Sequence, residues 1–146
     1  MQRSPLEQLR ALHDGPARGA SEAEVVALER ALGTRLPADY RAFLLWMGRD
    51  TEGMWQGTDC FIDDIVENTE GLPELLALHG LAGELAERYV CVLMHQGYIA
   101  LWFDVPTDSD DPQAFLFHEG QTERGIQPVQ TVMKMFLDDY EGLSRV

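Results

Sequence analysis

The sequence predicts an α+β fold, in which a central antiparallel or mixed β-sheet of about four to five strands is flanked by N-terminal helices and a C-terminal helix. Three patterns lead to this prediction. Apolar residues recur at helical spacing up to Gly48, β-rich runs begin at Tyr89, and a helical pattern returns after Thr131. Helices, then consecutive strands, then a closing helix is an order typical of α+β proteins. The length of 146 residues suits one domain, spanning 1–146.

The N-terminal part carries start and stop signals for three helices. Ser4 begins the first helix as an N-cap, followed by a proline and by a glutamate at the third position. Ser21 begins the second helix with a Ser-x-x-Glu capping box, and Gly33 is placed to end it. Pro37 opens the third helix, whose apolar side chains recur at i, i+3, i+4 and i+7.

The rest of the chain predicts shorter elements of both kinds. We expect a short strand at 60–62, after a loop rich in Gly and Asp, and a short helix that begins at Leu72-Pro73-Glu74. Two β-rich runs joined through His95-Gln96-Gly97 form a hairpin. The β-rich runs cover 89–94, 98–103 and 114–118. An edge segment that contains a proline covers 126–129, and a final helix capped by Thr131 covers 132–140.

Composition favours a folded protein of the cytoplasm. Hydrophobic residues make up 45% of the chain, which argues against disorder. No apolar run has the length of a membrane span, and the N-terminal MQRSPLEQLR lacks the apolar core of a signal peptide. Cys60 and Cys91 make no disulfide framework and have no CxxC partner, so we expect them to be buried thiols. We expect no association with a membrane.

Negative charge is concentrated in the middle of the chain, which has a formal net charge of −14. Between Asp50 and Glu123 there are 16 acidic residues and one basic residue, Arg88, whereas the remaining segments hold 9 acidic and 10 basic residues. Such a field repels a nucleic-acid backbone and attracts a basic protein. Acidic loops also keep proteins soluble without any partner, and this alternative stays open.

No pattern in the sequence predicts an enzyme or a metal site. The motifs GxSxG and GxGxxG and the P-loop do not occur. His95 and His118 are two histidines that the predicted sheet could bring together, but no HxxxH or CxxC spacing supports zinc. The acidic run Asp108–Asp111 lacks the glycine and glutamate of a calcium loop. We therefore expect no catalytic residue, no metal and no cofactor, and we rank a histidine base last among the alternatives.

Trp55 is the aromatic residue whose place the sequence leaves open. It lies in Glu-Gly-Met-Trp-Gln-Gly, and a tryptophan flanked by glycines and acids can anchor a protein interface. It can equally fold back into the core. Trp46 and Trp102 lie in apolar elements, and we expect both in the core.

A series of short segments carries a family resemblance. The capped helix start Ser21–Glu24 is followed by Leu32-Gly33 and by Leu36-Pro37-x-x-Tyr40. Further on come His95-Gln96-Gly97-Tyr98 with Trp102-Phe103, a strand at 115–117 and a helix at 135–137. On these segments the chain from 21 to 143 resembles the SUKH superfamily of Smi/Knr-type domains, and its hairpin resembles that of a bacterial branch. We interpret Leu36-Pro37-x-x-Tyr40 as a joint between two helices that identifies the fold, and we leave it out of the site.

The resemblance implies an α+β domain with no known catalytic residues. Bacterial members are mostly viewed as immunity proteins, which bind and neutralise a cognate polymorphic toxin, often a nuclease. Because nucleases hold phosphates they tend to be basic, so an inhibitor gains from carboxylates in the same place. We therefore expect a non-catalytic module that binds a basic toxin domain and binds no nucleic acid. The alternative is a general regulatory or scaffold protein of the Smi/Knr type without a toxin partner.

The residues expected at the interface are acids of the middle segment, with Trp55 as an aromatic anchor. These acids would steer a basic partner and accept hydrogen bonds from its Arg and Lys side chains. The acids are Asp59, Asp63, Asp64, Glu67, Asp108, Asp110 and Asp111.

Overall fold

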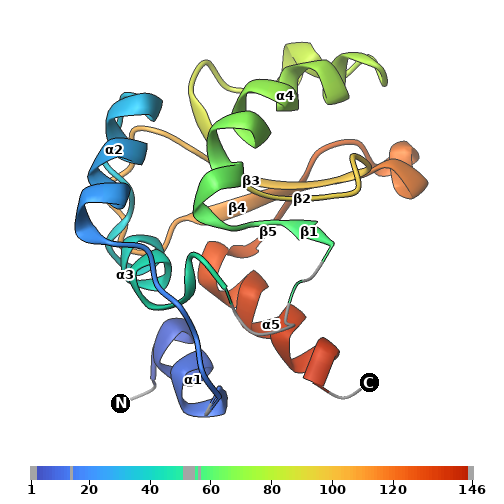
Figure 1. Cartoon of the computed structure of the whole chain (residues 1–146). Helices are drawn as coiled ribbons and strands as arrows, with labels where there is room; N and C mark the ends of the chain where they lie inside the picture. The colour runs from blue at the N-terminus through green and yellow to red at the C-terminus, as the bar shows by residue number, and fades with distance from the viewer. Residues whose placement is uncertain (1–2, 14, 51–54, 56, 145–146) are drawn as a thin grey trace.

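In the computed structural model, a five-stranded sheet lies between α-helices on its two faces (Figure 1). The structure describes residues 3–13, 15–50, 55 and 57–144. The strand order is β1-β2-β3-β4-β5, and each strand pairs antiparallel with the next. The predicted α+β fold is confirmed, and the sheet is antiparallel throughout rather than mixed.

The described residues form five α-helices, five strands and three 3₁₀ segments, with helices first, then most of the strands, then a closing helix. The helices are α1 (Pro5–Leu12), α2 (Glu22–Leu32), α3 (Ala38–Met47), α4 (Ile65–Ala77) and α5 (Val132–Ser144). The strands are β1 (Thr58–Asp59), β2 (Tyr89–His95), β3 (Ile99–Asp104), β4 (Gln113–His118) and β5 (Gln127–Thr131). The 3₁₀ segments are η1 (Ile62–Asp64), η2 (Ala82–Glu84) and η3 (Glu119–Arg124). Within the described residues, each helix is too short or too polar to cross a bilayer.

The helix signals of the N-terminal part form as predicted. Ser4 and Ser21 each close a capping box with the glutamate three residues later. Gly33 ends α2 at a φ of 71°, in the left-handed region that favours glycine. Pro37 is the cap that precedes α3 rather than its first helical residue. Local hydrogen bonds thus fix where these helices begin and end.

The middle of the chain differs from the prediction. α4 begins at Ile65 and carries Pro73 in its interior, whereas the sequence placed a helix start at that proline. An interior proline costs about 3 kcal/mol. Burial of a leucine contributes about 1.5–3 kcal/mol, and α4 buries three of them against the sheet, Leu72, Leu75 and Leu76. The strand expected at 60–62 lies instead at 58–59, where it pairs with the end of β2.

The two faces of the sheet carry separate apolar cores. Ala100 and Trp102 of β3 pack toward α4, while Leu101 and Phe103 pack on the opposite face with α1, α2, α3 and α5. This alternation follows from the two-residue period of a strand. Both cysteines are buried free thiols, as predicted, and burial raises the pKa of each. Of the two cores, the one on the α5 side of the sheet contains more buried residues.

On the α5 side, the first helix packs against the last. α1 contacts α5, and a hydrogen bond of 2.9 Å joins Nδ1 of His13 to the hydroxyl of Tyr140. Trp46, which the sequence placed in the core, is only partly buried. Its ring lies against His13, and the guanidinium of Arg10 lies 5.5 Å from its centroid.

Candidate partner-binding surface

Trp55 lies in the core. Its side chain is 3% exposed, and its ring centroid is 6.1, 5.5 and 5.9 Å from those of Phe43, Phe136 and Tyr140. Its Nε1–H donates a hydrogen bond to the carboxylate of Asp139. The core alternative is therefore the correct one, and we remove Trp55 from the candidate interface residues.

Four of the predicted acids lie together where β1 leads into α4. The intervening Ile62 and Ile65 are 6% and 0% exposed, so the chain buries its apolar residues here and turns its carboxylates outward. Three of the four acids are exposed and Asp64 is half-buried. We call this group the β1–α4 patch, and it consists of Asp59, Asp63, Asp64 and Glu67.

Hydrogen bonds hold the β1–α4 patch in place. The buried amide of Asn68 donates to the backbone carbonyl of Asp59 at 2.7 Å, which ties β1 to α4. The carboxylate of Asp64 accepts the N–H of Phe61 at 3.1 Å. Partial burial raises the pKa of Asp64, and the charges of neighbouring carboxylates, that of Glu67 included, raise this pKa further. The patch carboxylates are therefore close enough to repel one another.

One carboxylate of the patch has a cationic partner in the described part of the chain. Nη1 of Arg49 lies 3.2 Å from Oδ2 of Asp63, and the same guanidinium pairs with Glu24. Among the described residues, the other three patch carboxylates form no ion pair. The patch therefore keeps most of its negative charge uncompensated.

The other three predicted acids lie in the loop between β3 and β4. The carbonyl of Asp110 accepts the N–H of Asp39 at 3.0 Å, which holds this loop against the start of α3. The carboxylate of Asp111 accepts the N–H of Met133 at 2.9 Å, in the first turn of α5. Since Asp111 is used to cap a helix, Asp108 and Asp110 are the exposed loop carboxylates that can meet a partner.

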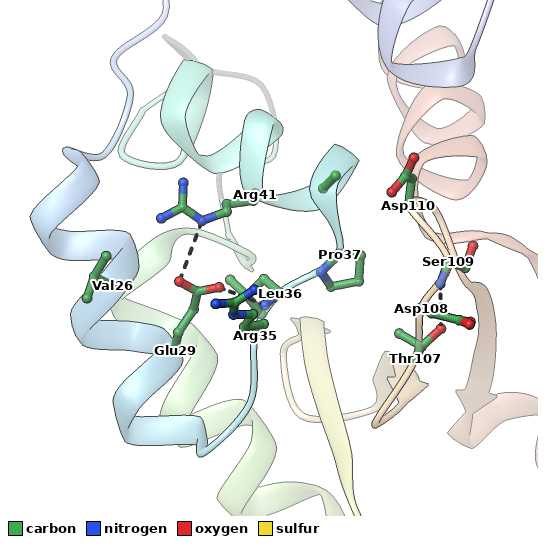
Figure 2. Close-up of a pocket in the computed structure, with 11 residues that line it drawn as sticks. Val26, Glu29, Arg35, Leu36, Pro37, Arg41, Thr107, Asp108, Ser109 and Asp110 are labelled. Carbon is green, nitrogen blue, oxygen red and sulfur yellow. Dashed lines mark hydrogen bonds and ion pairs between the residues drawn. The ribbon is translucent and has the colours of Figure 1, made fainter.

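A cleft of about 650 Å³ lies between this loop and α2 (Figure 2). Oε2 of Glu29 accepts the N–H of Leu36 at 2.8 Å, and Oε1 of Glu29 lies 3.5 Å from Nε of Arg41. The Leu36-Pro37 joint is buried, as expected of a connection between helices, but it also lines the cleft. Sequence reasoning missed the charged cleft residues on the α2–α3 side, because they meet only once α2 packs against α3: Glu29, Arg35 and Arg41.

His95 and His118 do not meet, although both lie in the sheet. Ile99 of β3 pairs with both of them and so lies between them. Nδ1 of His95 hydrogen-bonds instead with the hydroxyl of Thr58 at 2.9 Å. Within the described residues, no group of three or more His, Cys, Asp or Glu side chains is placed to hold a metal ion.

The profile of the SMI1/KNR4 family (SUKH-1) matches residues 19–139. The chain belongs to this family. The match covers α2, the cleft, the β1–α4 patch and the whole sheet, and it ends within α5. No curated protein matches the chain. Membership of the SUKH-1 family is consistent with a toxin-immunity protein or a Smi/Knr-type protein.

In this SUKH-1 domain the predicted acids form two groups instead of one. The β1–α4 patch follows α3 in the chain, while Asp108 and Asp110 lie beside the start of α3. Partial burial raises the pKa of Asp39, and nearby Asp111 and Asp110 add to this effect. The loop group is thus electrostatically coupled to α3, and among the described residues no hydrogen bond or ion pair links it to the patch.

Proposed function

We propose that this SUKH-1 protein is a non-catalytic, cytoplasmic binding module that neutralises a basic toxin domain by covering its active site. The observation that carries the proposal is the β1–α4 patch, where neighbouring carboxylates face solvent with little compensating positive charge. A partner that supplies Lys and Arg relieves their mutual repulsion and gains charge-assisted hydrogen bonds. Nuclease toxins fit this requirement because they must bind phosphates.

The experiment compares two double variants of equal charge. Asp59→Lys/Glu67→Lys reverses two exposed patch carboxylates whose side chains make no hydrogen bond in the described structure. Glu84→Lys/Glu87→Lys reverses two exposed acids that follow the opposite end of α4. The partner is to be sought as a toxin domain encoded beside the gene, and the measurement is the association rate at several salt concentrations.

The patch variant should bind roughly tenfold more slowly than the control variant at low ionic strength, and the difference should shrink as salt screens the charges. The patch variant should also protect cells less well against the co-expressed toxin domain. Equal association rates for the two variants would contradict the proposal.

A regulatory or scaffold role of the Smi/Knr type is the second candidate, and the cleft favours it. Its lining carries both signs of charge, which suits a peptide of mixed charge better than a strongly basic surface. This role predicts a specific partner that is not a toxin. Binding of that partner should depend on Arg35 and Asp108, which face the cleft, and not on the β1–α4 patch.

A further inference from the structure

An apolar groove of about 230 Å³ lies between the sheet and α5, and none of the contacts described above accounts for it. Figure 1 shows α5 running away from the sheet toward its C-terminal end, so the two diverge on this side. The strands contribute Leu93, Ile99, Leu101 and Leu116 to its lining. The helix contributes Met135 and Phe136, and the polar lining residues are His118 and Asp139.

The floor of the groove is one continuous apolar row. Leu93 pairs with Leu101 across β2 and β3, and Leu101 pairs with Leu116 across β3 and β4. The two outer leucines of this row are only partly buried, as is Ile99 beside them. Exposed aliphatic surface that is gathered into a groove is the usual form of a site for an apolar side chain.

One acidic side chain, that of Asp139, lies in the lining of this groove. Asp139 is exposed, and its carboxylate is held by the hydrogen bond from Trp55. The buried thiol of Cys60 lies within electrostatic reach of Asp64, Asp139 and Asp59, since these charges raise its pKa beyond the effect of burial. Cys60, which is next to Asp59 of the β1–α4 patch in the chain, belongs to the same apolar core as Phe136 of the groove.

We propose that the groove receives a leucine, isoleucine or phenylalanine side chain of a basic protein segment, whose adjacent Lys or Arg reaches Asp139. As a statement about the toxin partner, this inference rests on the proposed function, and it names the apolar anchor that the acids alone do not provide. Charge argues for a basic occupant over a second copy of the chain, because two copies would each bring a net charge of −14 to the interface. The acids would set how fast the partner arrives, and the groove would set how long it stays.

The test uses a synthetic peptide as the probe, Lys-Lys-Leu-Lys-Phe-Lys-Lys, and a matched peptide with serine in place of leucine and phenylalanine. Methyl NMR spectra of the whole chain are recorded during each titration. The apolar peptide should shift the methyl signals of Leu93, Ile99 and Leu116, while the serine peptide leaves them in place. Leu72, on the α4 side of the sheet, is the internal reference.

Two neighbouring residues of β2 supply matched variants. Leu93 packs on the α5 side and Met94 on the α4 side, and both are partly buried. Leu93→Gln should weaken binding of the apolar peptide roughly tenfold, whereas Met94→Gln should leave it unchanged.

Equal weakening by both variants, or equal methyl shifts with both peptides, would overturn the groove assignment. Groove shifts that depend on protein concentration without peptide would also overturn it, in favour of a second copy. The peptide titration needs no toxin, so its failure is separate from failure of the proposed function, which the lysine variants test. Apolar-peptide binding in the groove, together with equal toxin association for the two lysine variants, would keep the groove and reject the β1–α4 patch as the surface that attracts the toxin.

Discussion

Replacing Tyr40 with phenylalanine removes one buried oxygen and leaves the packing of the ring in place. The side chain is 0% exposed, and within the described structure its hydroxyl has no hydrogen-bond partner. The ring stacks on Phe43 at 6.4 Å between centroids and meets the edge of Phe103 at 6.1 Å. Both contacts survive in phenylalanine, so the substitution isolates the hydroxyl.

A buried polar group without a partner costs about 1–3 kcal/mol. We expect Tyr40→Phe to raise the free energy of unfolding by about 1 kcal/mol, at the low end of that range, because the lost oxygen also leaves a small gap. For a chain of 146 residues this gain corresponds to a rise in Tm of roughly 2–4 °C. Burial raises the pKa of Tyr40 well above its usual range, so the gain should not change between acidic and neutral pH.

Urea denaturation of the wild type and variant measures the effect, provided that the slope m stays constant. Tyr140→Phe is the matched control, because the Tyr140 hydroxyl hydrogen-bonds with His13 at 2.9 Å. The control should lose about 1 kcal/mol. If Tyr40→Phe is destabilised as much as the control, the Tyr40 hydroxyl has a partner, such as an ordered water, and the reasoning is wrong.

Three further substitutions test other contacts. Asn68→Ala deletes the 2.7 Å hydrogen bond to the Asp59 carbonyl, and it should lower the free energy of unfolding in urea by about 1–2 kcal/mol. An unchanged urea midpoint would refute this. Asp111→Ala removes the acceptor of the Met133 N–H and should lower the free energy of unfolding, measured by thermal denaturation, by about 1 kcal/mol. An unchanged Tm would show that this hydrogen bond does not stabilise α5. Burial raises the pKa of Asp39, so the folded state holds that proton more tightly than the unfolded chain, and this stabilisation is lost as pH rises. The gain in Tm from Asp39→Asn should therefore grow between acidic and neutral pH, and a constant difference would contradict the sign.

The sequence predicts well those features that depend on residues close together in the chain. The capping boxes at Ser4 and Ser21 and the glycine end of α2 need only contacts within a few residues. The turn between β2 and β3 is equally local, since the N–H of Tyr98 donates to the carbonyl of His95 at 3.1 Å. Successive side chains of β3 pack on opposite faces of the sheet, as the strand period requires, so the fold class and the core residues of the sheet follow as well.

Features that depend on tertiary packing are not visible in the sequence. Leu72-Pro73-Glu74 has the signature of a helix start, and only the burial of α4 against the sheet explains a helix that runs through the proline. The indole N–H of Trp55 donates its hydrogen bond to Asp139, which is 84 residues away in the chain. The concentration of acidic residues led us to predict that Asp111 contacts a partner. Its hydrogen bond to the N–H of Met133 could not be predicted, because it depends on where α5 packs.

The packing of α1 against α5 has a consequence for the synthesis of the protein. The ribosome delivers the N-terminal end first, and α5 follows all the other described elements. The apolar face of α1 therefore lacks its principal cover until nearly all of the described chain has been made. A nascent chain that stops before Val132 would lack the α5 side chains of the larger core and would expose the apolar residues that they cover to chaperones and proteases.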